Sequence, residues 1–278
     1  MTKRKNKRRS FWLIVAGILI LLYPIVATQY NDYHLYQQAE SYGRSVRDID
    51  PPTQRQHYLH AAHDYNDWLA QQGHHAYPPT PDSPGFERYL DTLNAPETGG
   101  VIARLRIPSI GVDLPVFHTT APNVLYSGAG HMFGSSLPVG GPGTNAVISA
   151  HTGMVNASMF DNLPRLRDGE TVTVDVMGET LTYKVTGREV VKPEDYEAVT
   201  YEAGKDKLTL ITCTPYGINT DRLLVHAERV PTQIEEESGW QPKLSWWMIL
   251  ALILIASVLA IVWWNERRHR KARSQRVD

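Results

Sequence analysis

The sequence predicts an all-β domain, a barrel or a sandwich, that carries a helical N-terminal extension and is flanked by two membrane-spanning helices. Short segments of alternating polarity, separated by turn residues, fill the central part of the chain. Apolar residues at helical spacing precede them, and two long uncharged runs lie near the ends of the 278 residues. The predicted order is a basic tail (1–10), a membrane helix (11–27), a helical extension with a proline-rich loop (28–98), the β domain (99–231), a linker (232–243), a second membrane helix (244–264) and a second basic tail (265–278).

The first apolar run, residues 11–27, has no charged residue and approaches the roughly 20 residues that span a bilayer. A basic segment precedes it, so a cleaved signal peptide is the alternative. Tyr23-Pro24 and Thr28-Gln29-Tyr30 stand where a small-x-small cleavage site is expected. We therefore predict an uncleaved anchor.

The second apolar run, residues 244–264, is bounded by pairs of tryptophans. Trp246 and Trp247 stand at one edge, and Trp263 and Trp264 stand at the other. Tryptophan is enriched where a membrane meets water. The run is therefore predicted to be a transmembrane helix.

Basic residues concentrate in the two tails. Twelve of the 28 Lys and Arg residues lie there: Lys3, Arg4, Lys5, Lys7, Arg8, Arg9, Arg267, Arg268, Arg270, Lys271, Arg273 and Arg276. Because positive flanks stay in the cytoplasm, both tails are predicted to be inside and residues 28–243 outside. The outer segment keeps 16 Lys and Arg against 27 Asp and Glu, a net charge of about −11. This charge argues against a nucleic-acid partner.

The extension is predicted to hold two helices within residues 29–76, broken at Asp50-Pro51-Pro52. Residues 77–86 contain four prolines and are predicted to form an extended loop. A short helix over residues 86–94 is expected after this loop.

The β domain is predicted to contain seven strands, at residues 101–107, 112–118, 145–151, 171–177, 181–191, 208–213 and 222–229. Two short helices are expected at residues 121–126 and 156–163, and Asn156 is the predicted N-cap of the second.

Cys213 is the only cysteine, so it cannot close a disulfide within the chain. Burial as a small apolar side chain is the simplest role for a lone cysteine. However, Cys213 and His151 each end a predicted strand, and Arg222 begins another. Strand ends converge at the rim of a barrel, so the three side chains can meet there.

These three residue types suit nucleophilic catalysis. The thiolate is the reactive form of cysteine, and a neighbouring cation lowers the thiol pKa. His151 could supply that cation or give a proton to a leaving amine. Arg222, always charged, could hydrogen-bond a substrate oxyanion. No Asp or Asn is placed by spacing alone as a third, orienting partner.

Two long motifs resemble those of sortases, the membrane cysteine transpeptidases of Gram-positive bacteria. TLITCTPYG with NTDRLLVHAERV resembles the TLxTC…R signature, and GHMFGSSLPVGGPGTNAVISAHTG resembles the stretch that bears the histidine. The resemblance spans residues 100–230 and implies an eight-stranded barrel. It also implies that Cys213 is the nucleophile, His151 the general acid or base, and Arg222 the group that stabilises the substrate.

The N-terminal extension and the second apolar run resemble class C sortases, which assemble pili. That class carries a lid with an Asp-Pro-aromatic tripeptide. Here Asp82 and Phe86 are the lid candidates, within Asp82-Ser83-Pro84-Gly85-Phe86, and a plain linker is the alternative.

The resemblance further implies a substrate with an LPxTG-like sorting signal, cleaved between Thr and Gly through a thioacyl intermediate. The acceptor amine would belong to a pilin lysine or, alternatively, to a cell-wall precursor. A membrane-tethered binding module without activity is a third hypothesis. No cofactor or metal is expected.

Other noticeable residues are predicted to be structural. The histidines at every third position of one helix rotate around its axis, which disfavours a shared zinc ion. Gly140–Gly143 lacks the Lys-Ser/Thr of a phosphate loop, and Ser135-Ser136 lacks a nucleophile-elbow pattern. The helix histidines are His57, His60 and His63. His118, His131 and His226 are also predicted to be structural.

Overall fold

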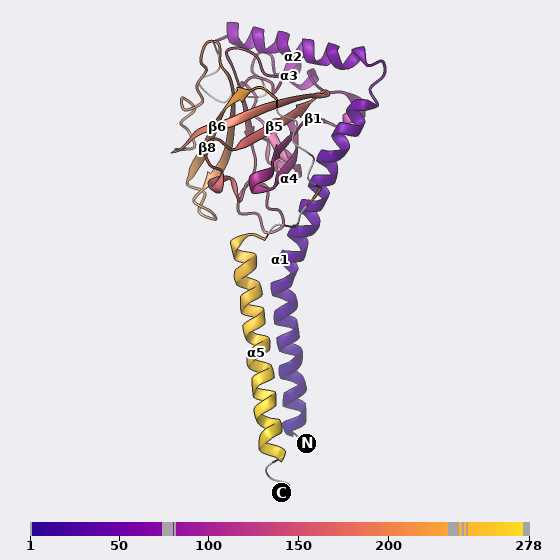
Figure 1. Cartoon of the computed structure of the whole chain (residues 1–278), viewed down its shortest axis with the longest axis vertical. Helices are drawn as coiled ribbons and strands as arrows, with labels where there is room; N and C mark the ends of the chain where they lie inside the picture. The colour runs from indigo at the N-terminus through magenta and orange to yellow at the C-terminus, as the bar shows by residue number, and fades with distance from the viewer. Residues whose placement is uncertain are drawn as a thin grey trace. The chain divides into compact units, whose positions relative to one another are not determined.

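The computed structural model describes residues 2–73, 80, 82–232, 239–240, 242 and 244–274 (Figure 1). Most of the predicted linker 232–243 and part of the proline-rich loop therefore lie outside the described residues. The chain divides into two compact units. One contains Met1–Tyr30, Val155–Ala157 and Pro242–Asp278, and the other contains Asn31–Met154 and Ser158–Gln241.

The first unit is built from two long apolar helices. α1 (Thr2–Arg47) begins in this unit and ends in the second, and α5 (Trp246–Ser274) follows the β domain. Within Phe11–Arg47 and Trp246–Asn265, an 18-residue stretch has a mean hydropathy of 2.4 in α1 and 2.5 in α5, and both helices are long enough to cross a membrane. Both predicted apolar helices are therefore present, and they suggest membrane anchoring.

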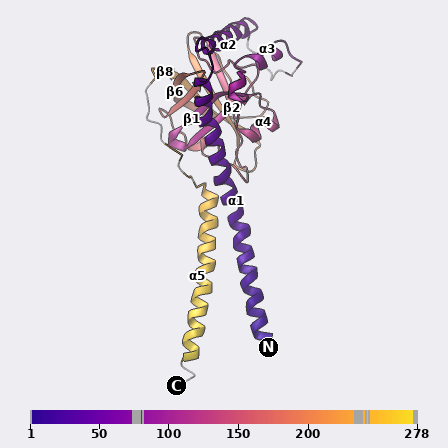
Figure 2. The same ribbon diagram turned by 90° about the vertical axis from the view of Figure 1, so that its right-hand side faces the viewer.

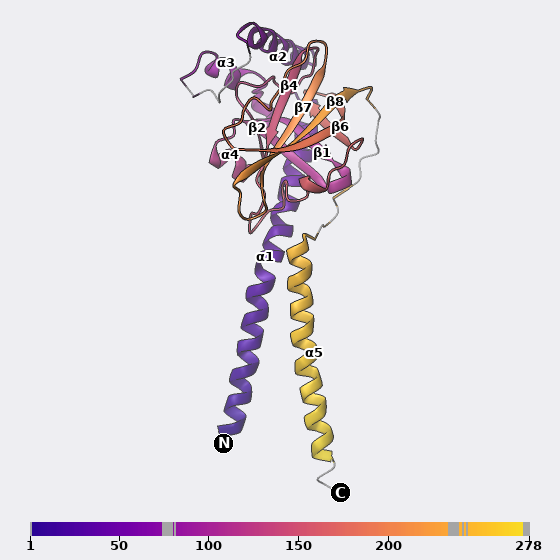
Figure 3. The ribbon, with the colours of Figure 1, turned by 90° about the vertical axis from the view of Figure 1, so that its left-hand side faces the viewer.

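The second unit is a closed eight-stranded barrel, as the resemblance implied. Around the barrel the strand order is β1-β2-β3-β4-β7-β8-β6-β5, with parallel pairs β2–β3 and β4–β7 and antiparallel pairs elsewhere. The strands are β1 (Val101–Ile107), β2 (Val112–His118), β3 (Ala129–His131), β4 (Thr144–Ser149), β5 (Thr171–Val176), β6 (Glu179–Val191), β7 (Asp206–Thr214) and β8 (Asp221–Val230). Figure 3 shows β4, β7 and β8 side by side.

The N-terminal extension packs on this barrel. The predicted break is confirmed, since α1 ends at Arg47 and α2 (Thr53–Gln71) follows it. The buried Tyr42 hydroxyl joins α1 to the barrel: it donates to the carbonyl of Ile102 at 2.9 Å and accepts from the amide of Met177 at 2.9 Å. Figures 1 and 2 show α2 across one end of the barrel.

α2 presents an apolar stripe to the barrel that comprises Leu59, Ala62, Tyr65 and Leu69. Full burial of one such large side chain contributes about 1.5–3 kcal/mol. Asn66 on the same face fixes the register, because its amide donates to the carbonyl of Leu137 and its oxygen accepts from the Leu137 amide.

Short helices complete the unit. α3 (Phe86–Asp91) and α4 (Pro122–Ser127) match two of the predicted helices. The predicted helix over residues 156–163, with Asn156 as its cap, is wrong: this segment consists of turns, and only a 3-10 turn, Leu163–Arg165, follows.

Tertiary contacts explain this failure. The amide of Ser158 donates to the Asp32 carboxylate at 2.8 Å, and the amide of Phe160 donates to the His151 carbonyl at 3.0 Å. Phe160 is also fully buried. Long-range partners have thus replaced the helical hydrogen bonds that local propensity favours.

Candidate active site

Cys213 and Arg222 face each other across the β7–β8 ladder. They are directly opposite residues in the antiparallel register, next to Thr212 opposite Leu223. Directly opposite residues project their side chains to the same face of a sheet, with Cβ atoms about 4.5–5.5 Å apart. Strand pairing therefore places the Cys213 thiol beside the side chain of Arg222.

His151 reaches the same level on the neighbouring strand. β4 and β7 are parallel, and their register ends with Ser149 beside Ile211. The amide of Ala150 donates to the Ile211 carbonyl at 3.2 Å, and the Thr212 hydroxyl donates to the Ala150 carbonyl at 2.8 Å. In the β4–β7 register, His151 and Cys213 both lie two positions beyond the last pair, so both lie at the same end of the barrel and on the same face.

The imidazole of His151 is held mainly by packing. Its ring lies 5.4 Å from the ring of Tyr126 at the end of α4, centroid to centroid, with an angle of 59° between the planes. Burial lowers the pKa of His151 below its ordinary value. The resting ring is therefore neutral near pH 7 and can accept a proton from a thiol.

Arg222 is fixed by the turn that precedes it. Its Nη1 donates to the carbonyls of Asn219 and Asp221 at 3.3 and 3.1 Å. The Asp221 carboxylate instead bonds Lys192 Nζ at 2.6 Å and the Thr220 hydroxyl at 2.7 Å, and these contacts lower the Asp221 pKa. Within the described residues no carboxylate lies at salt-bridge distance from Arg222, which leaves its remaining donors for a substrate oxygen.

An apolar surface continues the face that carries the three residues. Val147, Ile211 and Leu224 form a buried cluster on β4, β7 and β8. By strand alternation they share a face with His151, Cys213 and Arg222 respectively. Partly buried side chains from the end of β6, from the β6–β7 connection and from the segment after β3 pack on it: Val191, Ala198, Val199 and Met132.

The lid candidates have other neighbours in this structure. Asp82 is exposed. Phe86, the first residue of α3, packs edge-on against Phe133 at 4.9 Å and stacks with Tyr89 at 6.2 Å between centroids. Among the described contacts, none joins Asp82 or Phe86 to Cys213 or Arg222.

His131 is a structural residue at the centre of the unit. It is completely buried, its Nε2 donates to the Ser136 carbonyl at 2.8 Å, and its Nδ1 lies 3.0 Å from the Tyr89 hydroxyl, which donates to the His131 carbonyl at 2.9 Å. Burial lowers its pKa to about 3, so the ring is neutral with both nitrogens occupied. His118 donates from Nε2 to the Thr92 carbonyl at 2.9 Å, and burial lowers its pKa to about 4.

The other histidines named in the sequence analysis also lie outside the candidate site. His226 bridges the Thr209 hydroxyl at 3.2 Å and the Glu189 carboxylate at 3.0 Å. His57, His60 and His63 all belong to α2. No group of three His, Cys, Asp or Glu residues that could hold a metal ion occurs in the described part of the chain.

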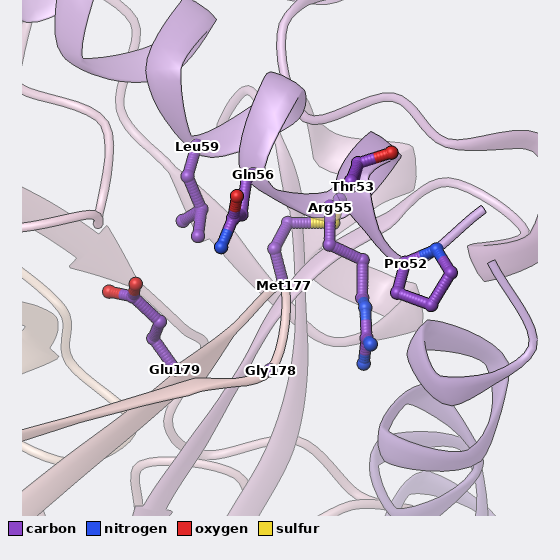
Figure 4. Close-up of a pocket in the computed structure, with 8 residues that line it drawn as sticks. All are labelled: Pro52, Thr53, Arg55, Gln56, Leu59, Met177, Gly178 and Glu179. Carbon is purple, nitrogen blue, oxygen red and sulfur yellow. The ribbon is translucent and has the colours of Figure 1, made fainter. Parts of the chain in front are cut away.

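A hollow of about 350 Å³ lies where α2 begins, over the β5–β6 turn. Figure 4 shows side chains that line it, from both α2 and the turn: Pro52, Thr53, Arg55, Gln56, Leu59, Met177, Gly178 and Glu179. Glu179 begins β6, whereas Val191, which pairs with Arg222, ends it. The hollow is therefore at the other end of β6 from Cys213.

Sequence reasoning missed two residues of the candidate site. Tyr126 was not predicted because a single aromatic in a short helix gives no periodic signal. Asp161 accepts hydrogen bonds from the amide of Gly153 at 2.8 Å and the hydroxyl of Thr152 at 3.1 Å, the two residues after His151. The interval between His151 and Asp161 in the sequence matches no known motif. Only the path of the loop in the structure brings Asp161 to the candidate site.

Comparisons with known proteins show the family to which the chain belongs. The sortase domain profile matches residues 105–230. Sortase A of Streptococcus agalactiae is 33% identical over 138 residues, which are 49% of this chain and 53% of that protein. The chain thus spans about half the length of this curated relative.

Solved structures extend the similarity. Sortase C-1 of Actinomyces oris is 43% identical, covers 64% of this chain and 99% of its own, and has a TM-score of 0.58. Sortase A of Corynebacterium diphtheriae is 38% identical, covers 73% of this chain and 97% of its own, and has a TM-score of 0.63. The chain therefore belongs to the sortase family, whose members are cysteine transpeptidases. Class C and class A sortases both occur among its structural neighbours.

Proposed function

We propose that this protein is a membrane-anchored class C sortase that cleaves an LPxTG-like sorting signal between Thr and Gly and transfers the threonyl end to an amine. The observation that carries the proposal is the pairing of Cys213 with Arg222 across β7 and β8, with His151 leaving the adjacent β4 at the same level.

The proposed reaction has two halves, acylation of Cys213 by the sorting signal and transfer of the acyl group to an amine. Neutral His151 accepts the thiol proton while Cys213 Sγ attacks the threonine carbonyl carbon, and Arg222 donates hydrogen bonds to the resulting oxyanion. The C–N bond then breaks, and His151 gives its proton to the glycine amine. An acceptor amine attacks the thioester, Sγ leaves, and His151 carries the amine proton back to the sulfur.

The apolar surface beside the cysteine supports an apolar substrate segment. Val147, Ile211 and Leu224 lie on the face that leads to the nucleophile, under Ala198 and Val199. The leucine and proline of a sorting signal would bury apolar area against the partly buried Ala198 and Val199 that cover this cluster, at about 25 cal/mol per Å². Binding of the signal would therefore present its Thr–Gly bond at the strand ends.

A pilin lysine is the proposed acceptor, and a cell-wall precursor amine is the alternative within the family. The N-terminal extension, the second apolar helix and the class C neighbours favour the pilin lysine. A membrane-tethered binding module without activity is the remaining alternative, and the presence of all three reactive residues opposes it.

A competition assay tests the function. The full chain in detergent micelles is incubated with a fluorescent LPxTG peptide, a pilin domain containing its acceptor lysine and a short glycine-based wall-precursor analogue. We expect thioacylation of Cys213 and ligation chiefly to the pilin lysine. Ligation only to the glycine analogue would assign wall anchoring instead, and no thioacyl adduct would disprove sortase activity.

The proposed topology places both basic tails in the cytoplasm and the barrel outside. Protease added to intact protoplasts is expected to degrade the barrel while tags at both termini survive. Permeabilised protoplasts serve as the control in which both tags are lost. Loss of the C-terminal tag in intact protoplasts would contradict the two-span arrangement.

The loop before α3 is proposed to act as a lid. Gly85, with φ of 84°, lies so close to Trp68 of α2 that a Cβ would be 2.2 Å from the indole ring, so the end of the loop is held in one pose. A closed lid lowers the apparent affinity for substrate in proportion to its population.

Asp82→Ala and Phe86→Ala are therefore expected to accelerate labelling of Cys213 by a thiol reagent and to raise peptide cleavage. Ser83→Ala in the same loop is the matched control and should label at the rate of the unmodified protein. Equal rates in all variants would show that the loop is only a linker.

A further inference from the structure

The segment that follows His151 has no regular secondary structure, yet its position decides where the imidazole lies. In the described part of the chain no hydrogen bond is made by the His151 ring itself. The backbone around it is instead tied down, because the Phe160 amide donates to the His151 carbonyl at 3.0 Å. The ring therefore depends on how residues 152–161 are held.

One carboxylate closes this segment into a loop. Asp161 Oδ1 accepts from both the Gly153 amide at 2.8 Å and the Thr152 hydroxyl at 3.1 Å. Thr152 is buried. Hydrogen bonds to an ionised acceptor are stronger than neutral ones, so this contact holds the two residues after His151 more firmly than a neutral acceptor would.

The same carboxylate faces the segment that follows Cys213. Asp161 Oδ2 lies 3.5 Å from the Tyr216 hydroxyl, a long hydrogen bond. Gly153 lies next to Gly217: a Cβ on Gly153 would be in ordinary van der Waals contact with the Gly217 amide nitrogen, at 3.5 Å. The loops after β4 and after β7 thus touch each other, with Asp161 bonded to both.

A second carboxylate supports the arrangement from α1. Asp32 accepts from the Ser158 amide at 2.8 Å, within the same loop. Burial raises the pKa of Asp161, while the hydrogen bonds from Gly153, Thr152 and Tyr216 oppose that rise. The group is therefore a half-buried acceptor whose lone pairs are used by the two loops.

We propose that Asp161 is a positioning residue of the transpeptidation reaction, which holds the loop of His151 against the loop of Cys213 and so sets the distance between imidazole and thiol. This inference rests on the proposed sortase function. Asp161 acts through the backbone of residues 152–153 and through Tyr216, without contact with the substrate.

The test compares Asp161→Ala with Asp161→Asn in the full chain. Asparagine keeps an oxygen that can accept from Gly153, so it should retain kcat within about five-fold, the difference between a charged and a neutral acceptor. Alanine should lower kcat by about 10- to 100-fold, because a displacement of about 1 Å has that effect on a reacting pair. KM should stay unchanged, since the signal binds on the neighbouring apolar face.

A readout independent of activity accompanies the kinetics. The Gly153 amide should exchange its hydrogen faster in Asp161→Ala and at the unmodified rate in Asp161→Asn. Asp168→Ala, at an exposed position in the next turn, is the matched control and should change neither readout.

The outcomes separate the two proposals. A chain that never forms a thioacyl adduct contradicts the proposed function, and the exchange rates still report whether Asp161 holds the loop. An active chain in which Asp161→Ala keeps its kcat, or in which Gly153 exchange is unchanged, overturns the positioning role. A rise in KM with constant kcat would also overturn it.

Discussion

Replacing Cys213 with alanine is expected to abolish cleavage of the sorting signal, with a loss of at least about 10⁴-fold in kcat, because nucleophile removal in a covalent mechanism leaves only binding and oxyanion stabilisation. The thiol is partly exposed near the end of β7, and the substitution removes only the sulfur atom and its hydrogen. The thermal midpoint should stay close to that of the unmodified protein.

The measurement uses the fact that Cys213 is the only thiol in the chain. Mass spectrometry should detect a peptide adduct on the unmodified protein and none on Cys213→Ala. Circular dichroism of the variant provides the control for folding. Undiminished turnover by a folded Cys213→Ala protein would show that the thiol takes no part in the mechanism.

The barrel could be predicted because its strands carry local signals. β1 and β2 occupy the predicted residues, and each is bounded by a glycine or proline that marks a turn. β3 was missed because its three residues are too few for alternation. Its pairing with Val116 and Phe117 of β2 and with Ser149 of β4, rather than its own composition, makes it a strand.

The candidate site was predictable to the extent that strand pairing builds it. Cys213 and Arg222 lie on two consecutive antiparallel strands joined by one short connection, so motif spacing and strand register both place them side by side. Asp161 and Tyr126 lie on irregular segments whose course depends on tertiary contacts such as the Asp32–Ser158 hydrogen bond. No period in the sequence encodes those contacts.

Arg222→Ala is expected to lower kcat by about 10²- to 10³-fold, the usual effect of losing one oxyanion donor. Arg222→Lys should also be severely impaired. The planar guanidinium can bond the Asn219 and Asp221 carbonyls through Nη1 and still direct other N–H groups outward, whereas an ammonium has no such fork. Steady-state kinetics with the fluorescent peptide measure both variants.

The split between kcat and KM identifies the role. An interaction that is made only in the transition state lowers kcat and kcat/KM equally, whereas uniform substrate binding raises KM alone. Arg229→Ala is the matched control: it removes the same charge from the same strand, where Arg229 lies 3.7 Å from the Asp206 carboxylate and over the Tyr183 ring. That variant should keep its kcat. If Arg222→Ala retained most of its kcat/KM, Arg222 would serve only to hold the β7–β8 turn, and oxyanion stabilisation would have to come from backbone amides beside Cys213.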